Sequence, residues 1–209
     1  KFLYRIISSA LHKSRSKYVC IYFLIWLNRS YKIPVNLSTS ETITFLLASL
    51  RGGGAEHVIL TVAKALSERG YRIDLVLLKA EGAHLANVPK SINLVDLNAS
   101  RSLFSIPRLV SYFLKEKPLV LFSSLPHVSI VTLAARFISF SSSQVYVVEH
   151  NTISQSVRHS HTFRGKLLPY IMKLMYPSCS GIICVSQGVA KDLASEIKIP
   201  NTANQMTVI

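Results

Sequence analysis

From Ile43 onward, short apolar runs rich in β-branched residues alternate with longer stretches in which apolar positions recur with helical periodicity. This alternation is typical of βα units that build a parallel sheet, because strands buried on both faces have no polar face. The pattern therefore predicts one α/β domain over residues 41–209. Its strands are predicted at 43–50, 73–78, 93–97, 119–123, 144–149, 181–185 and 206–209.

The clearest helical pattern covers residues 54–69, where the apolar positions fall on one face and Gly70 follows as a C-cap. A second helix is predicted to start near Ser105, with Pro107 in its first turn, and to end before Pro118. Further helices are predicted at 127–140, 163–175 and 187–197. Together these elements predict a Rossmann-like parallel sheet with helices on both faces.

The formal net charge is +14, and the first forty residues contain no carboxylate, since the first acidic residue is Glu41. We interpret residues 1–40 as a basic and apolar N-terminal extension. Such a segment favours phosphate-bearing surfaces, either anionic lipid or nucleic acid, although a solvated tail has the same composition. Its apolar run at 18–27 is about half the roughly 20 residues that a membrane-spanning helix needs. We therefore expect a membrane-surface anchor or a packed extension.

The three cysteines, Cys20, Cys179 and Cys184, are odd in number and lack CxxC spacing. Neither a disulfide framework nor a structural zinc site is indicated, and a reducing compartment is expected. The aspartates are isolated and form no DxD pair or cluster, so we expect no metal site within this chain.

In open parallel sheets, ligands bind beyond the carboxyl ends of the strands, so the residues just after each predicted strand are the candidates for a site. After the first strand, Gly52, Gly53 and Gly54 lead into the predicted helix. Their backbone can approach a phosphate closely, and the helix N-terminus offers free N–H groups and a partial positive charge. A tight turn without a ligand is the alternative.

Two widespread phosphate-binding motifs are absent from the chain. GxxxxGK[ST] does not occur, which excludes a P-loop NTPase. A dinucleotide GxGxxG that starts at Gly52 would need glycine where His57 stands, and no acidic residue closes the second predicted strand. A nicotinamide dehydrogenase is therefore disfavoured.

Polar residues follow three other predicted strands. His150 comes after the strand at 144–149, where its imidazole can donate to a substrate hydroxyl or accept its proton, and Asn151 adjoins it. Ser124 and His127 follow the strand at 119–123. Ser186 follows the strand at 181–185 and is an N-cap of the next helix, a ligand contact, or both.

Several segments resemble family 4 retaining glycosyltransferases. Residues 45–57 read FLLASLRGGGAEH and residues 63–71 read AKALSERGY, which resembles the opening of these enzymes. The tripeptide EHN at 149–151, and GIICVS at 181–186 with VAKDL at 189–193, resemble two later motifs of the same N-terminal domain. The resemblance covers residues from about 43 to 209 in the expected order.

This resemblance implies a two-domain GT-B enzyme, of which the chain is the N-terminal, acceptor-side half. It implies that Gly53 and Gly54 face the donor diphosphate and that His150, our candidate catalytic residue, lies near the transferred sugar and acceptor; Gly52 belongs to the same predicted diphosphate-binding loop. From their positions after predicted strands, the candidate acceptor-binding residues are Asn151, Ser124, His127 and Ser186. The substrate is a nucleotide-sugar, and no metal or other cofactor is expected.

The family's later E-x7-E element is missing, because no two glutamates of the chain stand eight positions apart. We therefore expect the C-terminal donor domain to be absent, so that this fragment alone binds a nucleotide-sugar weakly and catalyses little. The first forty residues lie outside the resemblance.

The leading hypothesis is sugar transfer from a nucleotide-diphosphate donor to a saccharide or lipid-linked acceptor in glycan biosynthesis. We expect a cytoplasmic protein at the inner face of the membrane, in peripheral contact with anionic lipid, and we do not favour nucleic acid as a partner. The alternative is a non-catalytic α/β protein that binds a membrane or nucleic acid through its basic segment, which explains the charge but not the glycine loop.

Overall fold

The computed structural model describes residues 41–154, 163–197 and 206–208. They form a seven-stranded sheet in the order β3-β2-β1-β4-β5-β6-β7, and every adjacent pair of strands is parallel. The α/β Rossmann-like sheet predicted from the sequence is therefore confirmed. The strands are β1 (Thr42–Leu47), β2 (Arg72–Leu77), β3 (Asn93–Asp96), β4 (Val120–Ser124), β5 (Gln144–Glu149), β6 (Gly181–Cys184) and β7 (Met206–Val208).

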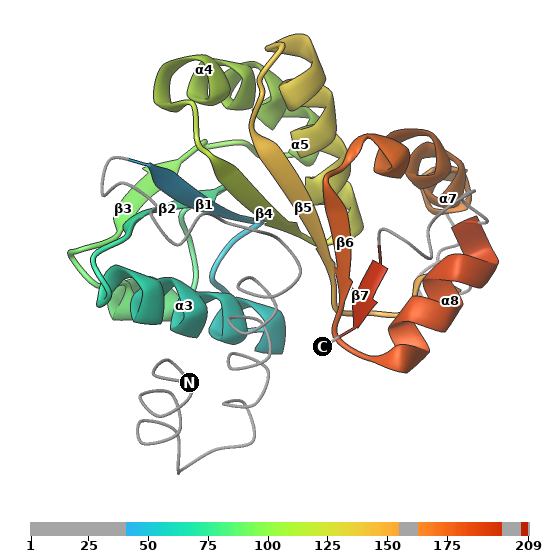
Figure 1. Ribbon diagram of the computed structural model, residues 1–209, viewed down its shortest axis with the longest axis horizontal. Coiled ribbons are helices and arrows are strands. Elements are labelled where there is room, and N and C mark those ends of the chain that lie inside the picture. The colour runs from blue at the N-terminus through green and yellow to red at the C-terminus, as the bar shows by residue number, and fades with distance from the viewer. Residues whose placement is uncertain (1–40, 155–162, 198–205, 209) are drawn as a thin grey trace.

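Helices cover both faces of the sheet (Figure 1). One face is packed by α3 (Gly54–Ser67) and by the short 3-10 helix η1 (Ala83–Asn87). The other face is packed by α4 (Ile106–Glu116), α5 (Pro126–Ile138), α7 (Phe163–Met175) and α8 (Gln187–Ile197). Two further 3-10 turns, η2 (Ser102–Ser105) and η3 (Tyr176–Ser178), precede α4 and follow α7.

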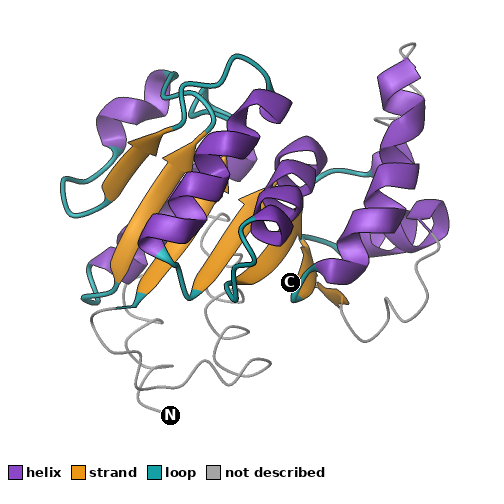
Figure 2. Cartoon of the chain, turned by 90° about the horizontal axis from the view of Figure 1, so that it is seen from above, coloured by secondary structure: helices purple, strands orange, loops and turns teal. Residues whose placement is uncertain are grey.

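The strand order reverses direction between β1 and β4. From β1 the chain moves outward to β2 and β3, and then returns through α4 to place β4 on the other side of β1. Because crossovers between parallel strands are right-handed, the outward and the return connections put their helices on opposite faces. The loops after β1 and β4 therefore lead to helices on opposite faces, which leaves a crevice at the carboxyl edge of the sheet. Figure 2 shows helices in front of the strands and behind them.

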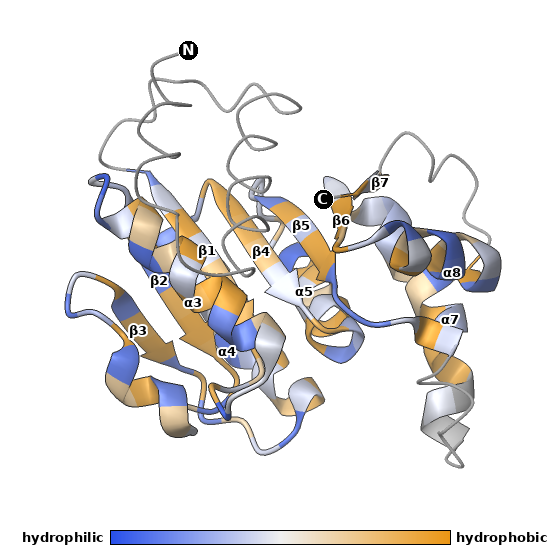
Figure 3. Cartoon of the chain, turned by 90° about the horizontal axis from the view of Figure 1, so that it is seen from below, coloured by the Kyte–Doolittle hydropathy of each residue, from blue (hydrophilic) through white to orange (hydrophobic). Residues whose placement is uncertain are grey.

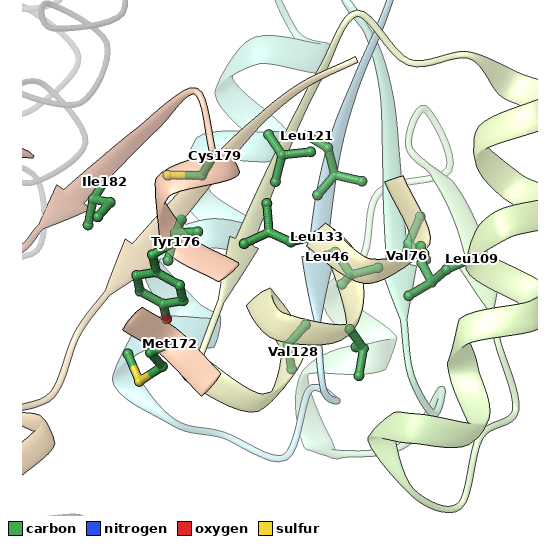
Figure 4. Close-up of a cluster of buried hydrophobic side chains, with 14 of the residues drawn as sticks. Leu46, Val76, Leu109, Leu121, Val128, Leu133, Met172, Tyr176, Cys179 and Ile182 are labelled. Carbon is green, nitrogen blue, oxygen red and sulfur yellow. The ribbon is translucent and has the colours of Figure 1, made fainter. Parts of the chain in front are cut away.

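Each face of the sheet has its own hydrophobic core. On the α3 face, the rings of Phe45, Phe122 and Tyr146 stack across three adjacent strands, with centroids 5.4 and 5.5 Å apart. On the opposite face, Leu121, Leu133 and other apolar side chains of the strands, α4, α5 and α7 interdigitate (Figure 4). The strands are accordingly hydrophobic along most of their length (Figure 3). Burial of both faces explains the continuous apolar runs in the sequence.

The structure shifts some element boundaries. β1 ends at Leu47 rather than at residue 50, because the chain turns there and the Leu50 amide donates to the Glu81 carbonyl at 2.9 Å. Leu50 is still fully buried, which is why the apolar pattern continued past the strand. α5 ends at Ile138, and Phe140 adopts a φ of 49°. The predicted extension at 1–40, with Cys20, lies outside the described residues.

Cys179 and Cys184 are both free and buried, and burial raises the pKa of their thiols to about 11 and about 12, respectively. Neither is a reactive thiolate at neutral pH. None of the helices within the described ranges is both long and apolar enough to cross a membrane.

Candidate functional site

A cavity of about 400 Å³ opens at the carboxyl edge of the sheet, beside the N-terminus of α3. This is the crevice between β1 and β4, where open α/β sheets bind ligands. The stacked rings of Phe45, Phe122 and Tyr146 lie beneath it. Two residues farther along each of these strands, and on the same face, come Leu47, Ser124 and Val148, respectively. The lining residues are Leu47, Ala48, Gly53, Gly54, Ala55, Glu56, Ser124, Leu125, His150, Asn151 and Val185.

Five of the residues that the sequence indicated line this one cavity: Gly53, Gly54, Ser124, His150 and Asn151. They follow β1, β4 and β5, which are neighbours in the sheet although β2 and β3 lie between β1 and β4 in the sequence, so the fold has brought them together.

Three other indicated residues do not line the cavity. Gly52 is exposed, with a left-handed φ of 121° that favours glycine. His127 is the second residue of α5 and is exposed. The hydroxyl of Ser186 accepts the Val189 amide at 3.2 Å, which makes this serine the N-cap of α8.

His150 and Ser124 line the cavity, and each has one buried polar atom without a hydrogen-bond partner among the described residues. Ser124 is 1% exposed, and neither its Oγ nor the His150 Nε2 has a hydrogen-bond partner within the part of the chain that the structure describes. Burial lowers the pKa of His150 to about 4, so its imidazole is neutral at neutral pH. A buried polar atom without a partner is costly, and a ligand hydroxyl would relieve that cost for both side chains.

The residue that follows Ser124 has an unusual backbone conformation. Leu125 has a φ of 78°, although it is not glycine, and it directly precedes Pro126. Its carbonyl accepts the amides of Val128 and Ser129 at 3.0 and 2.9 Å, which fixes the start of α5. A non-glycine residue in this region costs about 1–3 kcal/mol and is found mainly where a site requires it.

The glycine loop contains a contact that the sequence analysis missed. Oε2 of Glu56 accepts the amides of both Gly52, at 2.6 Å, and Gly53, at 3.0 Å. The first backbone bond of α3 runs from the His57 amide to the Gly53 carbonyl, so the amides at positions 54–56 have no carbonyl within the helix. The spacing of Gly53 and Glu56, N-cap and N3, is that of a capping box and was the available signal.

The cations next to the glycine loop are paired with a second glutamate. Arg51 Nε donates to Glu81 Oε1 at 3.0 Å, and Lys79 Nζ lies 2.8 Å from Glu81 Oε2. These hydrogen bonds, the one from Lys79 foremost, lower the pKa of Glu81. The pair of Arg51 and Glu81 joins the loop after β1 to the loop after β2, whereas Lys79 and Glu81 lie in the same loop. Neither cation lines the cavity.

The end of β5 is anchored from the opposite face. The Tyr176 hydroxyl donates to the Glu149 carboxyl, which is 1% exposed, and burial raises the pKa of Glu149 to about 7. Beyond His150, the Ser154 amide donates to Oδ2 of Asp192 on α8 at 3.0 Å. These contacts fix the backbone on both sides of the imidazole.

Within the ranges that the structure describes, no three His, Cys, Asp or Glu side chains are grouped so that they could hold a metal ion. The cavity instead offers a neutral imidazole, a hydroxyl, an amide, one carboxylate and the open amides of a helix N-terminus. This set of groups suits the hydrogen bonding of hydroxyl-bearing molecules.

Solved structures share this fold. Sucrose-phosphate synthase from Thermosynechococcus elongatus matches with a TM-score of 0.59 and 13% identity, over 81% of this chain and 47% of its own. HepE from Anabaena, in complex with UDP and glucose, matches with a TM-score of 0.58 and 17% identity, over 81% and 44%. The lipopolysaccharide outer core galactosyltransferase WaaB, in its apo form, matches with a TM-score of 0.56 and 13% identity, over 80% of this chain and 44% of its own.

The chain therefore spans less than half the length of these three structures. At such low identity the likeness shows the fold, which is that of the N-terminal Rossmann-like domain of GT-B glycosyltransferases. No curated protein sequence matches the chain.

A family model gives the assignment that the structures alone could not give. The model described as Glycosyltransferase Family 4 matches residues 52–209, which include the glycine loop, His150 and the strands from β2 to β7. The resemblance seen in the sequence is confirmed over most of the chain, and the protein belongs to Glycosyltransferase Family 4.

Proposed function

We propose that this chain is the acceptor-side half of an enzyme that moves a sugar from a nucleotide-diphosphate donor to a saccharide or lipid-linked acceptor, with retention of anomeric configuration. Family membership and the position of the cavity support this proposal. The observation that carries it is the pair of buried atoms without partners, Ser124 Oγ and His150 Nε2, in one cavity at the strand-order reversal.

His150 is the group that orients and polarises the reacting hydroxyl. Because burial lowers the pKa of His150, the ring is neutral and one of its nitrogens can accept the hydroxyl's hydrogen bond. Ser124 supplies a second hydrogen bond from the neighbouring strand, and Asn151 lies at the rim. Two fixed partners hold a hydroxyl in one orientation, which lowers the entropy cost of reaching the transition state.

The donor diphosphate is assigned to the N-terminus of α3. The amides at positions 54 and 55 and the helix dipole would stabilise the negative charge that develops as the diphosphate departs. The nucleotide and most of the donor sugar would be held by sequence beyond this chain, since the structures that it matches are about twice as long. Transfer is proposed to need no divalent cation, so an excess of EDTA should leave the rate unchanged.

We also propose peripheral contact with the inner, cytoplasmic face of a membrane. Support comes from the net charge of +14 and from two apolar side chains at the end of α5. Phe137 and Phe140 are 76% and 91% exposed, and their ring centroids lie 6.4 Å apart. Cosedimentation with vesicles of anionic lipid should be salt-sensitive and weaker after Phe140→Ser, while neutral vesicles should bind little.

The activity proposal is tested in the complete enzyme, meaning this chain with its natural continuation. His150→Ala should lower kcat at least about a hundredfold, as expected for loss of a group that handles a proton in the transition state. His57→Ala is the matched control, because His57 is exposed on α3 and does not line the cavity. Gly53→Val should weaken donor binding by crowding the helix N-terminus. Wild-type turnover in both His150→Ala and Gly53→Val would overturn the assignment.

A further inference from the structure

Glu56 is fixed in place by the loop that it caps. Its Oε2 takes hydrogen bonds from two consecutive amides, and the backbone before them is held by the loop after β2. The His84 amide donates to the Leu50 carbonyl at 3.1 Å, and a Cβ at Gly82 would lie 2.1 Å from that carbonyl. The backbone before the glycine loop is therefore held in place, and the Glu56 carboxylate that is bonded to the loop is not free to swing away from it.

The same contact fills the place where an anion would otherwise bind. Two adjacent backbone amides that point to one spot form a nest for an anionic oxygen. Here that oxygen belongs to the protein, so the amides of Gly52 and Gly53 are already occupied. A phosphate oxygen on this side of the cavity has only the amides from position 54 onward.

The charges around the cavity also disfavour an anion beside Glu56. Among the described residues that line the cavity, Glu56 is the one acidic side chain, and none is a lysine or an arginine. The cations Arg51 and Lys79 of the neighbouring loops are paired with Glu81. The open amides from position 54 onward and the helix dipole compensate an anion bound at the helix N-terminus. An anionic group placed beside the Glu56 carboxylate, away from those amides, would instead meet its repulsion.

Oε1 of Glu56 remains available. Among the hydrogen bonds of the described residues, only Oε2 of this carboxylate takes part. A carboxylate oxygen accepts strongly from hydroxyl groups, and such charge-assisted bonds are about twice as strong as neutral ones. Together with Ser124 and His150, Glu56 gives the cavity three side chains that can bond to hydroxyls on a sugar ring.

We infer that Glu56 is a specificity-determining residue, which selects a neutral, hydroxyl-rich sugar for this cavity and rejects a sugar that carries a carboxylate or phosphate beside the reacting hydroxyl. The inference rests on the proposed function, since it takes the cavity to be the acceptor site. It goes further in naming the class of acceptor and the residue that sets that class.

Pairs of sugars that differ in one group test this inference. The probes are methyl glucoside against methyl glucuronide, and methyl galactoside against methyl galacturonide, titrated into the whole protein at neutral pH and low salt. The wild-type chain should bind the neutral member of the preferred pair about tenfold more tightly, from the repulsion between two unit charges a few ångströms apart. Glu56→Gln, which keeps the shape and an acceptor oxygen, should bring the two affinities to within about twofold of each other.

Two variants control for side effects. Glu68→Gln makes the same change of charge at the exposed C-terminal end of α3 and should keep the wild-type discrimination. Glu56→Asp keeps the charge on a shorter side chain and should keep most of the wild-type discrimination between neutral and anionic sugars. Thermal unfolding of each variant shows whether the loop still folds.

An unchanged ratio in Glu56→Gln overturns the inference, and so does the absence of any neutral-sugar binding by the wild-type chain. The two proposals fail in different experiments. Discrimination that depends on Glu56, combined with normal turnover in the His150→Ala enzyme, would uphold this inference and remove the catalytic assignment of His150. Loss of turnover in His150→Ala with no effect of Glu56→Gln would do the reverse.

Discussion

At the carboxyl edge of the sheet, Ser124 Oγ and His150 Nε2 are buried without hydrogen-bond partners among the described residues, whereas buried polar groups in the amino half are paired with one another. There the Ser143 hydroxyl donates to the Pro118 carbonyl, and Arg136 donates to the Ser143 carbonyl at 2.8 Å. A smaller cavity of about 220 Å³ at this amino edge is lined by Arg72 and Glu116 among others, which form an ion pair at 3.1 Å.

The interior of the amino half follows the same rule. Asp74, which is fully buried, accepts from the Tyr112 hydroxyl at 2.7 Å and from the Asn93 amide at 3.1 Å. Tyr112 in turn lies 2.7 Å from Thr44 Oγ1. Polar groups that satisfy each other stabilise the fold, and those left open at the opposite edge are available to a ligand. The presence of a cavity does not distinguish the two edges of the sheet, since each edge has one.

The largest expected effect is on the paired side. Asp74→Ala should lower the free energy of unfolding by about 3 kcal/mol, because it removes a fully buried acceptor from the buried Tyr112 hydroxyl and from the Asn93 side-chain amide. Asp96→Ala is the matched control: Asp96 also accepts two hydrogen bonds, from the amides of Ala80 and Asn98, but it is exposed. That variant should lose about 1 kcal/mol of its free energy of unfolding, as measured by urea denaturation. Equal losses would remove burial as the reason for the difference.

The next effect concerns pH and the carboxyl edge. Burial raises the pKa of Glu149 from 4.5 to about 7, so its contribution to stability is complete below pH 4.5 and is lost as pH rises through about 7. Burial lowers the pKa of His150 from 6.5 to about 4, so stability is lost as pH falls from 6.5 through about 4. Between these values the two contributions oppose each other.

Single variants should separate the two contributions. Relative to wild type, Glu149→Gln should gain about 2 kcal/mol in free energy of unfolding as pH rises from 4.5 to 6.5. His150→Gln should show a change of similar size and opposite sign over this interval. Denaturation curves across the interval measure both. Parallel pH profiles for the two variants and the wild type would show that neither group has a displaced pKa.

The smallest effect compares two buried serines. Ser143→Ala should cost about 1 kcal/mol, since the Pro118 carbonyl loses its donor. Ser124→Ala removes a hydroxyl that has no partner in the described chain, so its stability should change by less than about 0.5 kcal/mol or rise. Sugar binding should show the reverse order, so that the Ser124→Ala chain binds a sugar more weakly than the Ser143→Ala chain does. A destabilised Ser124→Ala chain would mean that its hydroxyl belongs to the fold.

The sheet could be predicted because its physical cause is local. Strands such as Gln144–Glu149, which are buried on both faces, have to be apolar over most of their length. Gly70, which has a left-handed φ of 85°, follows the end of the first helix closely, although the C-cap itself is Glu68. The end of β1 could not be predicted, because Leu50 is buried by tertiary packing after the strand has ended. Apolarity indicates burial, and only indirectly an extended backbone.

The candidate site was predictable in its location but not in its bonding. The rule that ligands bind at the carboxyl ends of strands placed His150, Ser124 and Gly54 together. It left open whether Ser186 caps α8 or contacts a ligand, and it could not show that His127 lies outside the cavity, because both depend on how far each turn rotates. Glu56 was missed for a similar reason: a glutamate in a first helical turn is common, and its hold on two glycine amides appears only in three dimensions.

The register that pairs Ile43 of β1 with Val120 of β4 also affects how the protein reaches its folded state. Parallel strands so far apart in the sequence pair late, because the chain between them must be closed into a loop before any contact is gained. The cavity needs the turns after β1, β4 and β5 at once, so it does not exist in intermediates that contain only the first βα units. Binding of a sugar would therefore report the completion of folding, and a bound sugar would slow unfolding rather than speed the first steps of assembly.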